Sequence, residues 1–168
     1  TLLGRAPGFV AVTDNAEPRI HLLFVSRTDG TVVCSAPILP EDKSATDITV
    51  IGFEHAGPDG KSTGIYSAIV ENNWGHNIFP FANPEPGIVR VDLIQQADGS
   101  FRCEQIWSSA ERNLGVFKLS LGNGLVYLYG GEGSPLNSRW YLTALDVATG
   151  ETVYKQMVGT GLGYNNWA

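Results

Sequence analysis

Two carboxylate–asparagine pairs stand at comparable places in the chain, each directly after a β-rich run. They are Asp14-Asn15 and Glu71-Asn72, and Asn165 lies in a similar polar stretch near the end of the sequence. Carboxylate and amide oxygens are the hard ligands that Ca²⁺ takes, about six to eight at a time. These residue types in this pattern make Asp14, Asn15, Glu71, Asn72 and Asn165 candidate calcium ligands.

The same side chains have a second interpretation. Asp and Asn often close turns by hydrogen bonding to their own backbone two residues on. Asp14-Asn15 is typical of such a turn. For Glu71-Asn72 the two interpretations, ligand and turn residue, stay open.

His76 is the candidate catalytic residue. It lies in the long connection 71–87 together with Trp74, Phe79 and Phe81, and connections of this length usually serve function or are disordered. The ordinary pKa of histidine lies near neutrality, which suits a general base. The aromatic residues would cap a pocket or, alternatively, pack over a neighbouring element, and His76 itself could be a solvated side chain.

The other two histidines have structural interpretations. His21 stands among aliphatic residues in a β-rich run and is expected to be structural. His55 precedes the turn Gly57-Pro58-Asp59-Gly60 and is expected to be exposed.

The elements that position these residues are short strands arranged in a repeat. Three similar segments each contain a β-rich run, a tight turn and a second run, with the turn glycines at positions 30, 99 and 150. Aspartate or threonine followed by glycine between such runs is a strong hairpin signal. Each hairpin is preceded by another β-rich run that ends in polar or glycine residues.

Each unit therefore contains strand, turn, strand, loop, strand, tight turn and strand. Four antiparallel strands in about 40–50 residues are typical of a β-propeller blade. We predict an all-β fold, a single partial propeller domain over 1–168, with approximate blades at 1–39, 44–107 and 114–158 and the start of a further blade at 161–168. An ordinary β-meander or sandwich is the alternative.

The number of blades is lower than a closed ring needs, since closed propellers have about four to eight. Three blades would leave open edges that are prone to aggregation. The expected partner is therefore the missing propeller half, supplied by another segment or another chain. A small-molecule ligand is also compatible with this fold.

Two local resemblances accompany the repeat. Residues 144–154, Ala-Leu-Asp-Val-Ala-Thr-Gly-Glu-Thr-Val-Tyr, resemble the repeat of quinoprotein-like (PQQ-like) propellers. Residues 12–20, Val-Thr-Asp-Asn-Ala-Glu-Pro-Arg-Ile, resemble the Asp-Asn turn of six-bladed gluconolactonase- and paraoxonase-type propellers. The second resemblance implies a central Ca²⁺ that polarises a lactone or ester carbonyl. It also implies Asp14, Glu71 and Asn72 as ligands, with Asn165 or Asn166 as a further one.

Composition limits the function classes. The 168 residues are 43% hydrophobic and carry a net charge of -6, so nothing indicates a phosphate-binding surface and no nucleic-acid partner is expected. No apolar run approaches the roughly 20 residues of a membrane helix, so no membrane partner is expected. Few lysines and many Asn, Gly and Thr residues favour a secreted or periplasmic location.

Cys34 and Cys103 occupy equivalent positions, each four residues past a turn glycine. The outer strands of adjacent blades diverge, whereas a disulfide needs Cα atoms within about 7 Å. Regular blade geometry therefore argues against a bond between them. A secreted chain with two cysteines argues for one, so both outcomes stay open.

Three functional hypotheses follow. The first is a secreted or periplasmic propeller hydrolase, calcium-assisted, acting on a lactone or ester. The second is a non-catalytic propeller that serves as a binding or scaffold module. The third, a quinone-cofactor dehydrogenase, is the weakest because no cofactor cluster is recognisable.

Overall fold

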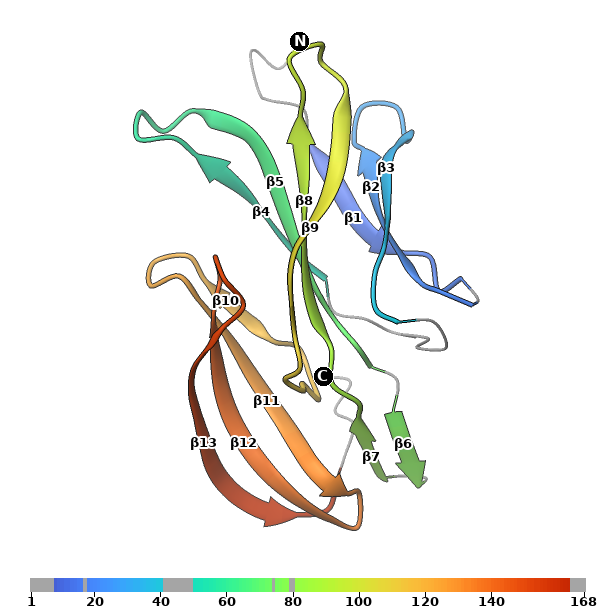
Figure 1. The fold of residues 1–168 in the computed structure, drawn as a ribbon, viewed down its shortest axis with the longest axis vertical. Helices are drawn as coiled ribbons and strands as arrows, with labels where there is room; N and C mark the ends of the chain where they lie inside the picture. The colour runs from blue at the N-terminus through green and yellow to red at the C-terminus, as the bar shows by residue number, and fades with distance from the viewer. Residues whose placement is uncertain (1–7, 17, 41–49, 74, 79–80, 164–168) are drawn as a thin grey trace.

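A computed structural model describes residues 8–16, 18–40, 50–73, 75–78 and 81–163 (Figure 1). These residues form thirteen strands and no helix. The prediction of an all-β fold is therefore confirmed for the described part of the chain.

The strands form three large antiparallel sheets and one small hairpin (Figure 1). The N-terminal sheet contains β1 (Phe9–Thr13), β2 (His21–Ser26) and β3 (Val32–Pro37). The middle sheet contains β4 (Val50–Ala56), β5 (Ser62–Glu71), β8 (Ile88–Gln95) and β9 (Phe101–Ser109). The C-terminal sheet contains β10 (Lys118–Ser120), β11 (Leu125–Ser134), β12 (Asn137–Asp146) and β13 (Thr152–Gly161). The hairpin consists of β6 (Gly75–Ile78) and β7 (Phe81–Pro84).

Tight turns link the last two strands of each large sheet, as the three glycines predict. Gly30, Gly99 and Gly150 have φ values of 76°, 85° and 74°. Glycine adopts this left-handed region without steric cost because it has no Cβ. The predicted hairpins are confirmed by the antiparallel pairing of β2 with β3, β8 with β9 and β12 with β13.

The middle sheet is covered by apolar contacts on both faces. Along β5, Tyr66, Ala68 and Val70 pack into a core shared with Leu22 and Phe24 of the N-terminal sheet. Ile69, which alternates with them, packs into a second core with residues of the C-terminal sheet. Successive strand residues point to opposite faces, so the three large sheets form a stack with the middle sheet inside.

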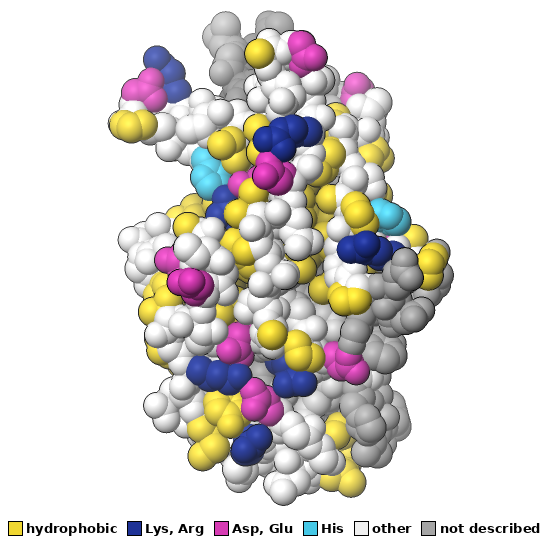
Figure 2. Space-filling view, viewed as in Figure 1, with side chains coloured by type: hydrophobic (Ala, Val, Ile, Leu, Met, Phe, Trp, Pro, Cys, Tyr) yellow, Lys and Arg dark blue, Asp and Glu magenta, His cyan; other side chains and the backbone are white. Residues whose placement is uncertain are grey.

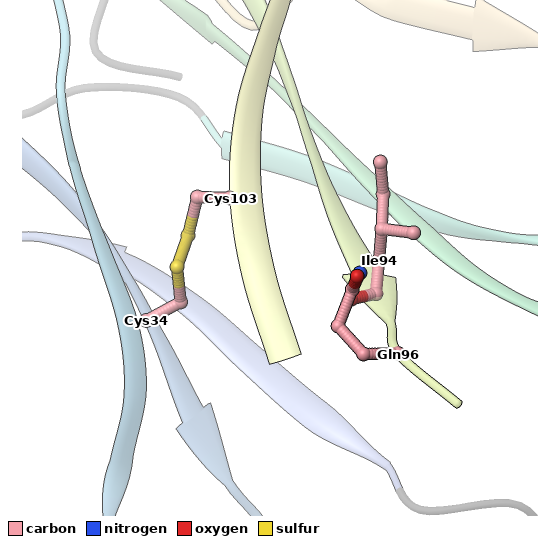
Figure 3. The surroundings of a disulfide bond; sticks show 4 residues. All are labelled: Cys34, Ile94, Gln96 and Cys103. Atoms are coloured by element: carbon pink, nitrogen blue, oxygen red, sulfur yellow. A yellow bond between two sulfur atoms is a disulfide. The ribbon is translucent and has the colours of Figure 1, made fainter. Parts of the chain in front are cut away.

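The pairing of Cys34 with Cys103 corrects the expectation drawn from regular blade geometry. Cys34 on β3 and Cys103 on β9 form a disulfide with a Cα–Cα distance of 6.0 Å (Figure 3). The last strands of the N-terminal and middle sheets therefore lie side by side instead of diverging. Regular outward splay of neighbouring blades does not hold for this pair of sheets.

The three large sheets cover 9–37, 50–109 and 118–161, within or close to the three predicted units. The strand expected at residues 1–4 lies outside the described residues, so three strands of the first unit are seen. β13 continues through Gly161, and the rest of the expected further blade from residue 164 onward is outside the described part. The connection after Glu71 contains the β6–β7 hairpin. Whether the stack belongs to a propeller remains a prediction.

Candidate functional site

Asp14 and Asn15 form the turn that follows β1. The Asp14 carboxylate accepts hydrogen bonds from the backbone amides of Ala16 (3.0 Å) and His21 (2.8 Å). Its other oxygen lies 2.9 Å from Nδ1 of His21. Asn15 has a φ of 51°, in the left-handed region that asparagine tolerates in turns.

The charge on Asp14 is stabilised by these contacts. Partial burial raises the pKa of this carboxyl, but the hydrogen bonds from the His21 and Ala16 amides, together with the His21 side chain, outweigh it and lower the pKa. His21 thus has the structural position expected of it, and both carboxylate oxygens of Asp14 bond to groups of the turn itself.

Glu71 and Asn72 lie at the end of β5 in a buried polar cluster that also contains Asn113. The exposed fractions of the three residues are 4%, 1% and 3%. The amide nitrogen of Asn113 donates to the Glu71 carboxylate and to the Gly115 carbonyl, while its oxygen accepts from the Tyr129 amide (2.9 Å). Glu71 is therefore bonded across the sheet boundary to a residue that precedes β10.

Asn72 holds together the two ends of the connection that contains the β6–β7 hairpin. Its side-chain nitrogen donates to the Glu85 carbonyl (3.1 Å), and its backbone amide donates to the Gly87 carbonyl (2.7 Å). Because a buried amide without partners is costly, these bonds fix where β5 ends and β8 begins.

The positions of the remaining predicted site residues are only partly described. His76 is in β6, where its backbone pairs with that of Asn83 in β7, and nothing is described of its side chain. Asn165 lies outside the described residues, as do Trp74 and Phe79. The structure therefore places Glu71 and Asn72 in one buried cluster and Asp14 and Asn15 in a separate turn. The role of His76 stays a prediction.

A second polar cluster, not expected from the sequence, lies on the face of the middle sheet that packs against the C-terminal sheet. It consists of His55, Ser67, Arg90 and Asp92. Arg90 forms two hydrogen bonds to the Asp92 carboxylate, at 2.8 and 2.7 Å, and both side chains are about 7% exposed. Such paired, charge-assisted bonds are the strong class of hydrogen bond.

The position of His55 corrects the expectation that it is exposed in a turn. β4 continues to Ala56, so the alternation of the strand places His55 on the same face as Ile51 and Phe53. Its Nε2 lies 2.7 Å from Oγ of Ser67 and 3.1 Å from Nη2 of Arg90. A guanidinium only donates, so the contact with Arg90 favours a neutral His55 ring over a charged one.

The local environment favours this neutral ring. Burial is the main cause that lowers the pKa of His55, and the positive charge of Arg90 lowers it further, against the raising effect of Asp92. The Ser67 hydroxyl donates to Asp92 at 2.6 Å.

The cluster has a Ser, a His and an Asp but lacks the geometry of a catalytic relay. In such relays the carboxylate orients the histidine, whereas Asp92 bonds to Ser67 and Arg90. Ser67 is only 2% exposed, and its hydroxyl donates to Asp92 and not to the histidine. The cluster instead ties two sheets together, because Arg90 and Trp107 both donate to the Val147 carbonyl at 2.9 Å.

One signal in the sequence could have revealed this cluster. Arg90 and Asp92 are two residues apart in an otherwise apolar strand, so they share one face and lie side by side. Two opposite charges inside such a strand indicate a buried ion pair. The approach of His55 and Ser67 depends on the register of β4 with β5 and β5 with β8, which the spacing alone does not give.

Acidic and basic side chains also gather over the C-terminal sheet (Figure 2). Lys155 lies 2.7 Å from Glu111 and 2.6 Å from Glu132. Arg139 lies 3.8 Å from Glu132. These partly exposed ion pairs join β13 to β11 and to the segment after β9.

A cavity of about 590 Å³ lies beside the first apolar core. Phe9, Phe24 and Tyr66 line it together with the charged residues Arg27 and Glu54. Its size is within the range of small-molecule sites. Among the described residues, the lining contains no histidine, and the His55 cluster contributes only Ser67 to it.

No family model matches the chain, and no curated protein or solved structure matches it. Within the part of the chain that the structure describes, no group of three or more His, Cys, Asp or Glu side chains could hold a metal ion. No helix among those residues is long and apolar enough to cross a membrane. The resemblances to quinoprotein-like and gluconolactonase-type propellers therefore remain predictions.

Proposed function

We propose that the chain is a binding or scaffold module of propeller type, a stack of β-sheets whose two end faces bind further polypeptide. The observation that carries this proposal is that both end faces are apolar and exposed. Each is the face of an outer sheet that points away from the middle sheet.

The end face of the N-terminal sheet, here the aliphatic end face, consists of Val10, Val12, Leu23 and Val25. Val10 pairs with Val25 and Val12 pairs with Leu23 across β1 and β2. Val10 and Val12 are 48% and 40% exposed. The alternating residues Phe9, Ala11, Leu22 and Phe24 pack inward.

The end face of the C-terminal sheet, here the aromatic end face, consists of Tyr127, Tyr129, Trp140, Leu142 and Tyr154. Tyr129 stacks on Trp140 with ring centroids 4.9 Å apart, and Tyr129 pairs with Leu142 across β11 and β12. Tyr129 is 49% exposed. A groove of about 490 Å³ runs along this face.

Antiparallel sheets with one solvated face normally alternate apolar residues inward with polar residues outward. The strands β1 and β2 and the central residues of β11 and β12 carry mainly apolar side chains on both faces, which is the pattern of strands buried on both sides. Contiguous exposed apolar patches of this kind mark interaction sites. The disulfide supports the accompanying proposal of a secreted or periplasmic location, because disulfides persist in oxidising compartments.

The test is the binding of anilinonaphthalene sulfonate, a dye that fluoresces on exposed apolar surface, to the dilute folded chain. We expect fluorescence that falls when Val12 or Leu142 is replaced by Thr. The matched control is Leu136→Thr, at a lone apolar residue in the β11–β12 turn that is 54% exposed. A folded monomer that does not bind the dye, or whose dye binding is unchanged by both end-face substitutions, would contradict the proposal.

A calcium-assisted hydrolase is the second candidate, and the buried carboxylate of Glu71 beside Asn72 is the observation that favours it. Burying a carboxylate is costly unless it is paired or coordinated. The donor set fits only in part, since Asn113 turns its amide N–H toward Glu71 and its oxygen toward the Tyr129 amide. When bound, Ca²⁺ would polarise a lactone or ester carbonyl.

Calorimetric titration with CaCl₂ separates the two candidates. Under the hydrolase proposal, the chain binds Ca²⁺ and the variant Glu71→Gln does not, while Asp98→Asn in an exposed turn binds as the wild type does. Absence of Ca²⁺ binding by the folded wild-type chain would rule out this second candidate and leave the first unaffected.

A further inference from the structure

The two end faces of the stack lie on the two outer sheets of one chain. One presents small branched side chains and the other presents large flat rings. The aliphatic end face is built from β1 and β2, whose sequences Phe-Val-Ala-Val-Thr and His-Leu-Leu-Phe-Val-Ser contain no Lys, Arg, Asp or Glu. It presents small, branched side chains in two directly paired rows.

The aromatic end face presents large flat rings beside a groove. Its wall is formed by Tyr127, Tyr129 and Trp140, and Val116, which is 45% exposed, stands at the groove as well. Lys118 lies beside it on the short strand β10. Aromatic rings packed against branched aliphatic side chains already form one interface within this molecule, where Phe9 and Tyr66 meet the aliphatic core between the N-terminal and middle sheets.

We infer that each end face is covered by a second copy of this chain, bound head to tail, with the aliphatic end face of one copy on the aromatic end face of the other. This inference rests on the proposed function, because it names the polypeptide that the end faces bind. The contact continues the sheet-on-sheet stacking that already joins the three large sheets of one chain.

The second copy is favoured because a single chain carries both halves of the contact. Unlike surfaces on one chain make a heterologous contact, which closes into a ring when the rotation allows and otherwise extends. Two copies arranged in a ring cover both end faces of each chain, whereas any open arrangement leaves one of each exposed. Two copies would contribute six large sheets, within the range of about four to eight blades of closed propellers.

The experiment measures the mass of the native chain by light scattering after size exclusion, over a wide range of concentrations. The expected mass is about twice the 18.1 kDa of one chain. The variants Val12→Lys and Leu142→Lys each place a charge on one end face. Each is expected to be a monomer, because every head-to-tail contact then includes one altered face.

Mixing the two variants gives the sharpest readout. The Val12→Lys chain keeps an intact aromatic end face, and the Leu142→Lys chain keeps an intact aliphatic end face. In a ring of two copies, such a pair has one intact contact and one contact in which both faces are altered. We therefore expect the mixture to form pairs containing one chain of each kind, at higher concentrations than the wild type needs. The control Leu136→Lys is expected to keep the wild-type mass, and unchanged urea unfolding of the dilute variants shows that they fold.

Three outcomes would overturn the inference. One is a wild-type chain that stays monomeric at all concentrations. Another is a single-face variant that pairs with itself as tightly as the wild type, because every contact in such a pair would include the altered face. The third is a mixture that stays monomeric at all concentrations although the wild type pairs.

Dye binding distinguishes failure of the second-copy inference from failure of the proposed function. A monomer that binds anilinonaphthalene sulfonate keeps the proposed function, with another protein as the partner, and overturns only the second copy. A monomer that does not bind the dye contradicts both. A wild-type pair with little dye binding, together with recovery in the mixture, supports both.

Discussion

Removal of the Cys34–Cys103 disulfide should lower the free energy of unfolding by about 4 kcal/mol. The bond joins β3 to β9 and closes a loop between residues separated by 69 positions. For a loop of that length the chain-entropy relation gives about 15 cal/mol/K, or about 4.4 kcal/mol near room temperature. A domain is usually stable by only about 5–15 kcal/mol, so this single bond carries a large share.

The assay is urea unfolding of the double variant Cys34→Ala/Cys103→Ala beside the oxidised wild type, followed by circular dichroism. The same loss corresponds to a fall in Tm of about 8–16 °C, at about 2–4 °C per kcal/mol for a domain of this size. Reduction of the wild type should reproduce the stability of the double variant. Ser35→Ala, at an exposed residue next to Cys34, is the matched control and should change little.

Two results would refute this reasoning. A loss below about 1 kcal/mol would mean that the unfolded chain is not restricted by the loop as the entropy relation requires. An equal effect of reductant on the double variant would mean that the reductant acts elsewhere. Either result would also remove the argument that the bond holds the N-terminal sheet to the middle sheet.

Three further predictions concern single residues of the core. Gly150→Ala should cost on the order of 3 kcal/mol in urea unfolding, because Gly150 has a φ of 74° and an added Cβ would lie 2.5 Å from the Trp107 ring. Asp92→Asn should cost about 3–5 kcal/mol in the same assay, since it leaves the buried Arg90 charge without its partner. Stability should fall as the pH drops below the ordinary histidine value of 6.5, because burial and Arg90 lower the pKa of His55 and the unfolded chain binds the proton more readily. The variant His55→Gln should flatten this part of the pH profile.

Each of these predictions has a matched control and a contrary outcome. Gly30→Ala keeps the left-handed φ of 76° but has open space around the added Cβ, so it should cost only about 1–2 kcal/mol. Equal losses at positions 30 and 150 would contradict the role of the tryptophan contact. Asp98→Asn, in an exposed turn, should lose much less stability than Asp92→Asn. A pH profile that is unchanged by His55→Gln would mean that other groups control stability in that range.

The hairpins show how much of the fold local sequence could predict. Gly30, Gly99 and Gly150 each mark a tight turn because the left-handed conformation is a property of the residue itself. The short β-rich runs of β1, β2 and β5 likewise indicate strands without knowledge of their neighbours. The all-β class and three units of strands followed from these two signals.

The candidate site was less predictable. The sequence singled out Glu71 and Asn72 by type, but Asn113, the partner of Glu71, lies 42 residues further along the chain. His55 was expected to be exposed, because a glycine-rich turn follows it closely. The end of β4 at Ala56, its pairing with β5 and the packing of the C-terminal sheet over this face decided otherwise.

The sequence by itself determined the strands and their turns, since these depend on residues within a few positions of one another. Only the tertiary structure decided which faces meet and which edges adjoin. The disulfide shows this clearly, because Cys34 and Cys103 have equivalent places in their units, yet regular repetition argued against their bond. Their contact depends on how two whole sheets pack, which is set by the summed contacts of many side chains, so residue spacing does not encode it.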